Sequence, residues 1–273
     1  MARSKPPEGP PWDLPLAEAP LAFVDLEMSG LDVENDRVLE VAIFVERGGV
    51  VIDSLVSLVR PEPFAYGAGE IHGIPEDELR LAPTFAELAP RIRELLEGAV
   101  FVAHGSRWDL AFLAREAQLA EIELPLGHYL DTLTLSRRAF HMTTHSLDAL
   151  AKELGIDRGR AHRAEADVVV LRALFRKCIE VLGAGSPREL FGVRIAERVI
   201  RDEVKAACLE AMARKVPLGL TYRPSGKKPE DLRFMVTAVQ DEPSRISGYD
   251  VSSRARRELR GERIVAVSPL DRA

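Results

Sequence analysis

Two carboxylate side chains near the start of the chain are spaced as a pair that can bind a cation. Asp25 and Glu27 stand two residues apart in residues 21–27, a stretch typical of a buried strand. Side chains two apart on a strand share a face and lie ~6–7 Å apart along it. That face includes Phe23, so the acids repel each other at the edge of a core, and at least one must take up a proton unless a cation holds them. Solvated acids at a strand end are the alternative.

Two further acids and a histidine are candidates for the same site. Asp109 follows Ser106 by three residues, so its alternative role is to complete a capping box at a helix start. Asp167 precedes apolar residues by four, seven and eleven positions, which puts a charge beside the apolar stripe of its own helix, where it needs a partner or a metal. His162, beside a loop that contains Gly159, is expected to swing toward this site. A lone histidine is more often structural, so His162 counts only with its neighbours.

Periodicity along the chain predicts the elements that must bring these residues together. We expect strands at 21–27, 37–46, 49–59, 99–103 and 128–133. We expect helices at 84–97, 107–119, 133–140, 146–154 and 165–182. Gly48-Gly49 predicts a hairpin, and Thr84 with Glu87 predicts a helix start. A three-strand meander followed by alternating strands and helices indicates an α/β domain over 21–183, with a mixed sheet flanked by helices.

Outside this domain, the chain divides into three further parts. Residues 1–20 are rich in proline and lack periodicity, so we predict a flexible leader. A Gly-Ala-Gly-Ser-Pro linker opens a helical segment at 184–214. Four short strand candidates, at 216–222, 233–240, 245–251 and 262–268, predict a small β-barrel over 215–273.

Composition and charge exclude several classes of protein. The 273 residues are 46% hydrophobic and 29% charged, which excludes a mainly disordered chain. No apolar run reaches the ~18–20 residues of a membrane span, and no signal-peptide core is present. Two cysteines are too few for a disulfide framework. We therefore expect a cytoplasmic protein without a membrane partner. The net charge of −6 divides into −11 over residues 1–204 and +5 over residues 205–273. The acidic residues 1–204 and the basic residues 205–273, called here the basic tail, are predicted to be modules with different partners. Cations bound to the acidic part would reverse its local electric field.

Five motifs, two of them made of a pair of stretches, resemble those of one enzyme family. Residues 23–32, 104–109 and 162–167 resemble the three motifs of the DEDDh 3′–5′ exonucleases. Two further pairs of stretches, 71–74 with 83–85 and 130–133 with 146–150, are similar to the proofreading exonuclease subunit of bacterial replicative DNA polymerase. The resemblance covers about residues 20–182 and implies a ribonuclease H-like fold.

The resemblance also implies a two-metal site. Asp25, Glu27 and Asp167 would bind the first ion, Asp25 would bridge to the second, and Asp109 would act there directly or through water. His162 would be the general base, for which an imidazole with a pKa near ~6.5 is suited. Two ions ~3.5–4 Å apart supply a hydroxide-like nucleophile and relieve charge on the leaving oxygen. Ligands that are all oxygen select Mg²⁺ or Mn²⁺ over zinc.

Substrate-side residues follow from the same resemblance. Ser29, Gly30 and Leu31 would approach the terminal nucleotide, with Leu31 wedged beside the last base, and His104 of the second motif is a further substrate-binding candidate. Ser29 replaces the commoner Thr and keeps the hydroxyl, whereas Gly105 replaces the Asn usual after the second-motif histidine. The first motif is closer to oligoribonucleases and the later motifs are closer to DNA proofreaders.

We therefore expect a metal-dependent 3′–5′ exonuclease that acts on single-stranded 3′ ends, with DNA favoured over RNA, and releases nucleoside 5′-monophosphates. One alternative is an oligoribonuclease-like RNA exonuclease. Another is a non-catalytic nucleic-acid-binding or regulatory protein on an exonuclease scaffold, or a subunit whose tail docks a polymerase or repair partner. Inactive relatives usually lose one of the acids, and all four acids and His162 are present here.

The basic tail weakly resembles a second family. Residues 205–270 are similar to the WYL-type small barrel of bacterial regulators, which is SH3- or Sm-like, although the Trp-Tyr-Leu signature is missing. Five arginines crowd ten residues, and either bind phosphate or form a solvated strand face: Arg254, Arg256, Arg257, Arg260 and Arg263. Tyr222 and Tyr249 either stack on bases or belong to the core.

Overall fold

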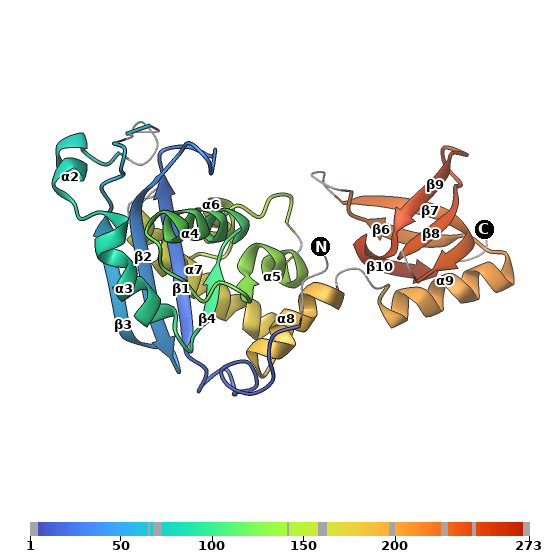
Figure 1. The fold of residues 1–273 in the computed structure, drawn as a ribbon. Coiled ribbons are helices and arrows are strands. Elements are labelled where there is room, and N and C mark those ends of the chain that lie inside the picture. Colours follow the sequence, from blue (N-terminus) through green and yellow to red (C-terminus); the bar gives the residue numbers. More distant parts are fainter. Residues whose placement is uncertain are drawn as a thin grey trace. The chain divides into compact units, whose positions relative to one another are not determined.

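The computed structural model describes residues 5–64, 66–67, 73–140, 142–157, 163–196, 200–224, 229–241 and 244–269. The chain divides into two compact units, residues 1–140 with 145–192 and residues 193–273 with 141–144 (Figure 1). Each unit has its own sheet and its own hydrophobic core.

The sheet of the first unit is mixed and has β1 in its middle, in the order β3-β2-β1-β4-β5 (Figure 1). Its strands are β1 (Leu21–Met28), β2 (Val38–Arg47), β3 (Val50–Leu58), β4 (Val100–Ala103) and β5 (Tyr129–Asp131). The first three form the predicted antiparallel meander, and Gly48 and Gly49 both take positive φ (58° and 84°) in the hairpin between β2 and β3. β4 and β5 run parallel to β1, so these three strands end at the same edge. The predicted α/β mixed sheet is confirmed.

The helices that accompany this sheet are α2 (Glu76–Leu81), α3 (Phe85–Leu96), α4 (Arg107–Leu119), α5 (Thr132–Ala139), α6 (Leu147–Glu153), α7 (Ala164–Leu182) and α8 (Pro187–Ala196). α3 and α4 pack on one face of the sheet and α7 packs on the other. The capping box predicted from Thr84 and Glu87 opens α3, with both reciprocal hydrogen bonds present. No helix in the described part of the chain is long and apolar enough to cross a membrane.

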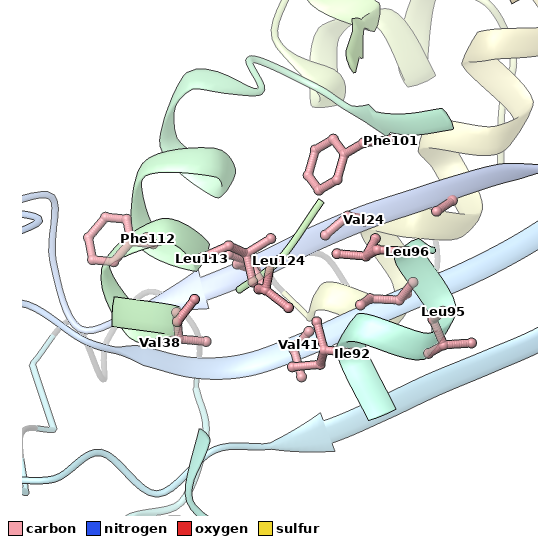
Figure 2. Packing of buried hydrophobic residues seen from close by; sticks show 14 of the residues in the cluster. Val24, Val38, Val41, Ile92, Leu95, Leu96, Phe101, Phe112, Leu113 and Leu124 are labelled. Atoms are coloured by element: carbon pink, nitrogen blue, oxygen red, sulfur yellow. The ribbon is translucent and has the colours of Figure 1, made fainter. Parts of the chain in front are cut away.

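The two faces of β1 pack against different helices. Val24 faces α3 and α4, where it meets Ile92 and Phe112 in one hydrophobic cluster (Figure 2). Phe23 faces the other side and makes an edge contact with Phe175 of α7, with ring centroids 5.3 Å apart. Because side chains alternate along a strand, the residues at 25 and 27 lie on the α7 side with Phe23.

Residues 5–20, predicted as a flexible leader, pack against the first unit. Trp12 is 4% exposed and makes edge contacts with the rings of His128 and Phe191, with centroids 6.2 and 5.8 Å away. Arg188 of α8 pairs with Asp13. A single buried indole removes enough apolar surface from water to hold a short segment, and such an anchor leaves no periodic pattern in the sequence.

The second unit is an antiparallel sheet with one helix on it. Its elements are α9 (Asp202–Arg214), β6 (Leu218–Tyr222), β7 (Glu230–Gln240), β8 (Arg245–Asp250), β9 (Arg256–Arg260), the 3₁₀ turn Gly261–Arg263 and β10 (Ile264–Pro269). The sheet order is β10-β6-β7-β8-β9, so β10 and β9 are its edges and the described strands form an open sheet, not a closed barrel. Sequence periodicity missed β9, since four of its five residues are charged. Val204 and Cys208 of α9 pack with Leu220, Phe234 and Ile246 in the core.

Both cysteines are buried free thiols. Burial raises the pKa of Cys178 to about 12 and that of Cys208 to about 11. A thiol that stays protonated in this way is a poor nucleophile and a poor metal ligand, so these residues contribute to packing.

Candidate active site

Asp25 and Glu27 lie toward the end of β1, the central strand of the sheet. The register with β2 places Asp25 opposite Ala42 and Glu27 opposite Glu40. β4 and β5 end at the same edge as β1, and the segments that follow them carry Asp109 and the α5 N-cap. The carboxyl ends of strands in α/β sheets are a usual location for ligand sites.

Asp167 completes a cluster of three carboxylates. It lies in the first turn of α7, is 7% exposed, and offers an oxygen within 4.8 Å of carboxylate oxygens of both Asp25 and Glu27. These residues lie up to 142 positions apart in the chain, and the contact between α7 and β1 brings them together. Asp25 and Glu27 are themselves half-buried, so the solvated strand end weighed as an alternative describes their surroundings only in part.

Asp109 approaches the same strand end from α4. It is 7% exposed, and its carboxylate accepts hydrogen bonds from its own backbone N–H and from that of Leu26 on β1. Ser106 makes no capping hydrogen bond, so the alternative that Asp109 only completes a capping box is wrong. Its carboxylate is near enough to raise the pKa of Asp25.

The electrostatics of the cluster disfavour the charged forms of its carboxyl groups. Burial raises the pKa of Asp25 well above its usual range, and the negative charges of Asp109 and Asp167 raise it further. Burial also raises the pKa of Glu27 to about 7, with contributions from Asp167 and Glu40. The pKa of Asp109 rises to about 7, mainly through burial and then through the charge of Asp131. Carboxyl groups pushed this far toward the neutral form are those that a bound cation would ionise.

The donor set fits a hard divalent ion. The cluster of Asp25, Glu27 and Asp167 offers carboxylate oxygens, with no histidine or cysteine in the cluster among the described residues. Such donors suit Mg²⁺ or Mn²⁺ and disfavour zinc.

A buried ion pair that sequence reasoning missed anchors the start of α7. The side chain of Glu40 is 1% exposed and accepts from Arg163, with Nη2 of the arginine 2.7 Å from Oε1. The backbone N–H of Ala164, the first residue of α7, donates to the other carboxylate oxygen at 3.0 Å. Glu40 interrupts an apolar run in β2. Because a buried carboxylate needs a partner, this interruption was the signal in the sequence from which the ion pair could have been predicted.

The loop after β1 is held by its own side chains. The Ser29 hydroxyl donates to Asp36 at 2.9 Å and accepts from the backbone N–H of Arg37 at 3.0 Å. A Cβ on Gly30 would lie 2.3 Å from the Asp36 carboxylate, so the loop closes this tightly because that position is glycine. Leu31 is 64% exposed. Of the three residues predicted to approach substrate, Leu31 has the free side chain, and the hydroxyl of Ser29 is engaged within the loop.

The far end of this loop is clamped to α4, the helix that carries Asp109. The Arg37 guanidinium makes two hydrogen bonds to Glu116, at 2.7 and 2.6 Å, and the Glu116 side chain is 2% exposed. A two-point pair of this kind holds both position and orientation. The loop of Leu31 and the helix of Asp109 are thereby joined.

Both ring nitrogens of His104, another predicted substrate contact, bind the protein. Nδ1 lies 2.9 Å from the Thr132 hydroxyl and Nε2 lies 2.8 Å from the backbone carbonyl of His145, and burial lowers the pKa of the ring. Gly105 takes φ 74°, a conformation that Gly, and next Asn, adopts most readily, and its N–H donates to Asp131 at 2.9 Å. Asp131, which the sequence candidates did not include, ties this turn to the N-cap of α5.

His162, the predicted general base, lies outside the described residues. The description of the chain resumes at Arg163, which the ion pair with Glu40 holds.

Comparison with known proteins shows to which family the chain belongs. The family model for Exonuclease (RNase_T) matches residues 22–175. This chain belongs to the exonuclease family. The matched range contains every carboxylate of the cluster, the whole of α4, which carries Asp109, and the first part of α7, which carries Asp167.

Curated relatives of this exonuclease domain are much longer proteins. The DNA polymerase III PolC-type of Thermotoga maritima is 28% identical over 174 residues, 62% of this chain and 12% of that protein. The 3′-5′ exonuclease DinG of Staphylococcus epidermidis is 33% identical over 167 residues, 59% of this chain and 18% of that protein. A DNA polymerase III subunit epsilon-like protein of Rhodobacter capsulatus is 37% identical over 208 residues, 68% of this chain and 29% of that protein.

Solved structures share the fold at low identity. Exonuclease X in complex with 5′ overhanging duplex DNA superposes with a TM-score of 0.52 at 24% identity, covering 64% of this chain and 99% of that one. Exonuclease I of E. coli, in complex with a dA16 oligonucleotide, superposes with a TM-score of 0.57 at 19% identity, covering 85% and 55%.

Proposed function

We propose that this protein is a metal-dependent 3′–5′ exonuclease that shortens single-stranded DNA from its 3′ end and releases nucleoside 5′-monophosphates. One observation carries the proposal. Three carboxylates from β1 and α7 offer oxygens within 4.8 Å of one another, and Asp109 is near enough to raise the pKa of Asp25. A cluster so rich in negative charge is suited to bind divalent ions that in turn bind a phosphate.

In the proposed mechanism the four acids would bind two metal ions. Asp25, Glu27 and Asp167 would hold one ion, and Asp25 with Asp109 would hold a second, directly or through water. When bound, the ions supply a hydroxide-like nucleophile and offset the charge on the leaving oxygen. His162 takes the proton from the attacking water, and Leu31 packs beside the terminal base.

Relatives and neighbours support DNA as the substrate. The curated relatives named above include PolC-type polymerases and an exonuclease, and two of the superposed structures are complexes with DNA. A polymerase or a repair protein is the proposed partner, and the PolC-type relative supports the polymerase. An RNA substrate is the second candidate, since a 3′-exonuclease that recognises a histone mRNA stem-loop also shares the fold, with a TM-score of 0.52 at 18% identity.

End-labelled oligomers test direction, metal dependence and substrate together. The purified chain is incubated with single-stranded DNA or RNA carrying a label at its 3′ or 5′ end, with Mn²⁺, Mg²⁺ or EDTA. We expect the 3′ label to be released first as a mononucleotide, more rapidly from DNA, and the release to disappear with EDTA and in Asp25→Asn.

Other outcomes would reject the proposal. Release of the 5′ label first would reverse the direction, and internal fragments would indicate an endonuclease. If a folded wild-type chain bound Mn²⁺ and oligomer without releasing any nucleotide, the non-catalytic scaffold would be the better description.

A further inference from the structure

The sheet of the second unit has one face without a covering helix among the described residues. α9 packs on the face that carries Leu220, Phe234 and Ile246. Because side chains alternate along each strand, the intervening residues form the opposite face, which we call the outer face. Its members on the last three strands of the sheet order are Asp231, Arg233, Met235 and Thr237 of β7, Arg245, Ser247 and Tyr249 of β8, and Arg256, Glu258 and Arg260 of β9.

Tyr249 is the exposed aromatic residue of this face. It is 45% exposed, whereas Tyr222 is 8% exposed and belongs to the core. The register places Met235 opposite Tyr249 on one side and Arg256 opposite it on the other. A phenol ring flanked by a thioether and a guanidinium is a platform on which a flat aromatic ligand can stack.

On these three strands the outer face carries an excess of positive charge, with four arginines against the two acids Asp231 and Glu258. Arg233 and Arg256 are exposed and form no ion pair with any described residue. Arg245 stands directly opposite Arg260 across β8 and β9, an arrangement that destabilises a sheet unless an anion intervenes. Glu258 pairs with Arg245 and leaves Arg260 without an acid among the described residues.

The geometry of these groups matches a strand of nucleic acid. Neighbouring strands lie ~4.8 Å apart, and Arg233 lies two residues along β7 from Met235, the residue opposite Tyr249, so Arg233 on β7 and Arg256 on β9 stand ~12 Å apart with Tyr249 on the strand between them. Cations on both sides of an exposed ring are what a single strand requires, since its bases are free to stack while phosphates continue on either side. A duplex hides its bases from such a platform, and a phosphate-only ligand leaves the ring without a partner.

We propose that the outer face binds single-stranded nucleic acid, with Tyr249 stacked on a base and Arg233 and Arg256 contacting phosphates on either side. The inference rests on the proposed function only for the class of polymer, since none of these residues belongs to the carboxylate cluster. The nucleic-acid strand would then be bound at the outer face as well as at the site that binds its 3′ terminal nucleotide.

The test is binding of fluorescein-labelled oligomers of thymidylate or uridylate to the full chain in EDTA, measured by anisotropy over a range of salt. Tyr249→Ala should weaken binding ~5–150-fold, whereas Tyr249→Phe, which keeps the ring, should bind as the wild type does. Arg233→Ala and Arg256→Ala should each reduce the salt slope by about 0.7. Arg214→Ala, which removes an exposed arginine from α9 instead, is the matched control and should leave affinity and slope unchanged.

Melting curves establish that each variant is folded, and cleavage of a trinucleotide reports the active site separately. Trinucleotide cleavage should be equal in the wild type and in Tyr249→Ala. If folded Tyr249→Ala and both arginine variants bound oligomers as the wild type does, the inference would fail while the proposed exonuclease stood. If the wild type cleaved nothing but Tyr249→Ala still lost binding, the proposed function would fail and this site would stand.

Discussion

Arg163 and Glu40 form a buried ion pair across 123 residues of sequence, and this pair fixes where α7 begins. The same Glu40 carboxylate accepts the backbone N–H of Ala164, so the first turn of α7 is fastened to the strand beside β1. Asp167 lies in that first turn and His162 immediately precedes Arg163. The ion pair is therefore the link between the sheet and the third group of candidate residues.

We predict that Glu40→Gln lowers both Mn²⁺ affinity and turnover by ~10–100-fold, the usual cost of losing a residue that orients metal ligands. The physical reason is loss of the charge that holds Arg163, which frees the first turn of α7 to move away from Asp25. Isothermal titration and the end-label assay measure the two quantities.

Glu46→Gln is the matched control for this variant. Glu46 is another buried β2 glutamate, and it pairs with Arg172 and Arg176 farther along α7. Its loss should lower thermal stability as Glu40→Gln does while leaving metal affinity and turnover near wild type. Equal losses of activity in both variants would show that the ion pair only stabilises the fold.

The metal-free protein should lose stability as the pH rises from about 4.5 to about 7. Glu27 and Asp109 have pKa values of about 7 in the fold, against ordinary values of 4.5 and 3.8, so the folded chain binds more protons than the unfolded chain in this window. Their protonated forms favour the fold at the acid end, and ionisation removes that advantage. Melting in EDTA should therefore give a higher Tm at pH 5.5 than at pH 7.5, and added Mn²⁺ should raise the Tm at pH 7.5. A Tm that rises with pH across this window would contradict the assignment.

Asp25→Asn should abolish nuclease activity and yet stabilise the metal-free protein at pH 7.5. Asparagine removes a buried charge among other carboxylates, and each ~1 kcal/mol gained in this way raises the Tm by ~2–4 °C in a domain of this size. Calorimetry in EDTA measures the effect. Asp53→Asn, on the exposed β3, is the control and should give no such gain.

His162→Ala should lower turnover sharply and leave Mn²⁺ affinity close to that of the wild type. A general base takes part in proton transfer and is not needed to hold the ion, so the two measurements should separate. Titration of Mn²⁺ beside the end-label assay provides both. Strongly weakened Mn²⁺ binding in this variant would instead make His162 a ligand.

Trp12→Ala should destabilise the first unit by ~3–5 kcal/mol, the usual cost of removing a large buried aromatic side chain. Trp108 is 38% exposed, so Trp108→Ala should cost much less and serves as the control. Urea titration of both variants measures the difference. If Trp12→Ala cost no more than Trp108→Ala, residues 5–20 would behave in solution as the flexible leader that their composition predicts.

Local patterns in the sequence predicted much of the first unit. The Gly48-Gly49 turn and the Thr84–Glu87 capping box depend on residues adjacent to one another, and both formed as expected. The charged strand β9 shows no alternating pattern in its sequence. It forms a strand because it pairs with β8, and this pairing cannot be read from its own residues.

What the sequence by itself determined is the order of the strands and of most helices in the first unit, and which residue types were available for chemistry, since propensity and periodicity act over a few residues. Only the tertiary structure decided that Asp25, Glu27 and Asp167 meet, that Glu40 fastens the helix bringing the last of them, and that Tyr222 is buried while Tyr249 faces outward. These relationships join residues far apart in the chain. They depend on how helices and strands pack, which no local pattern encodes.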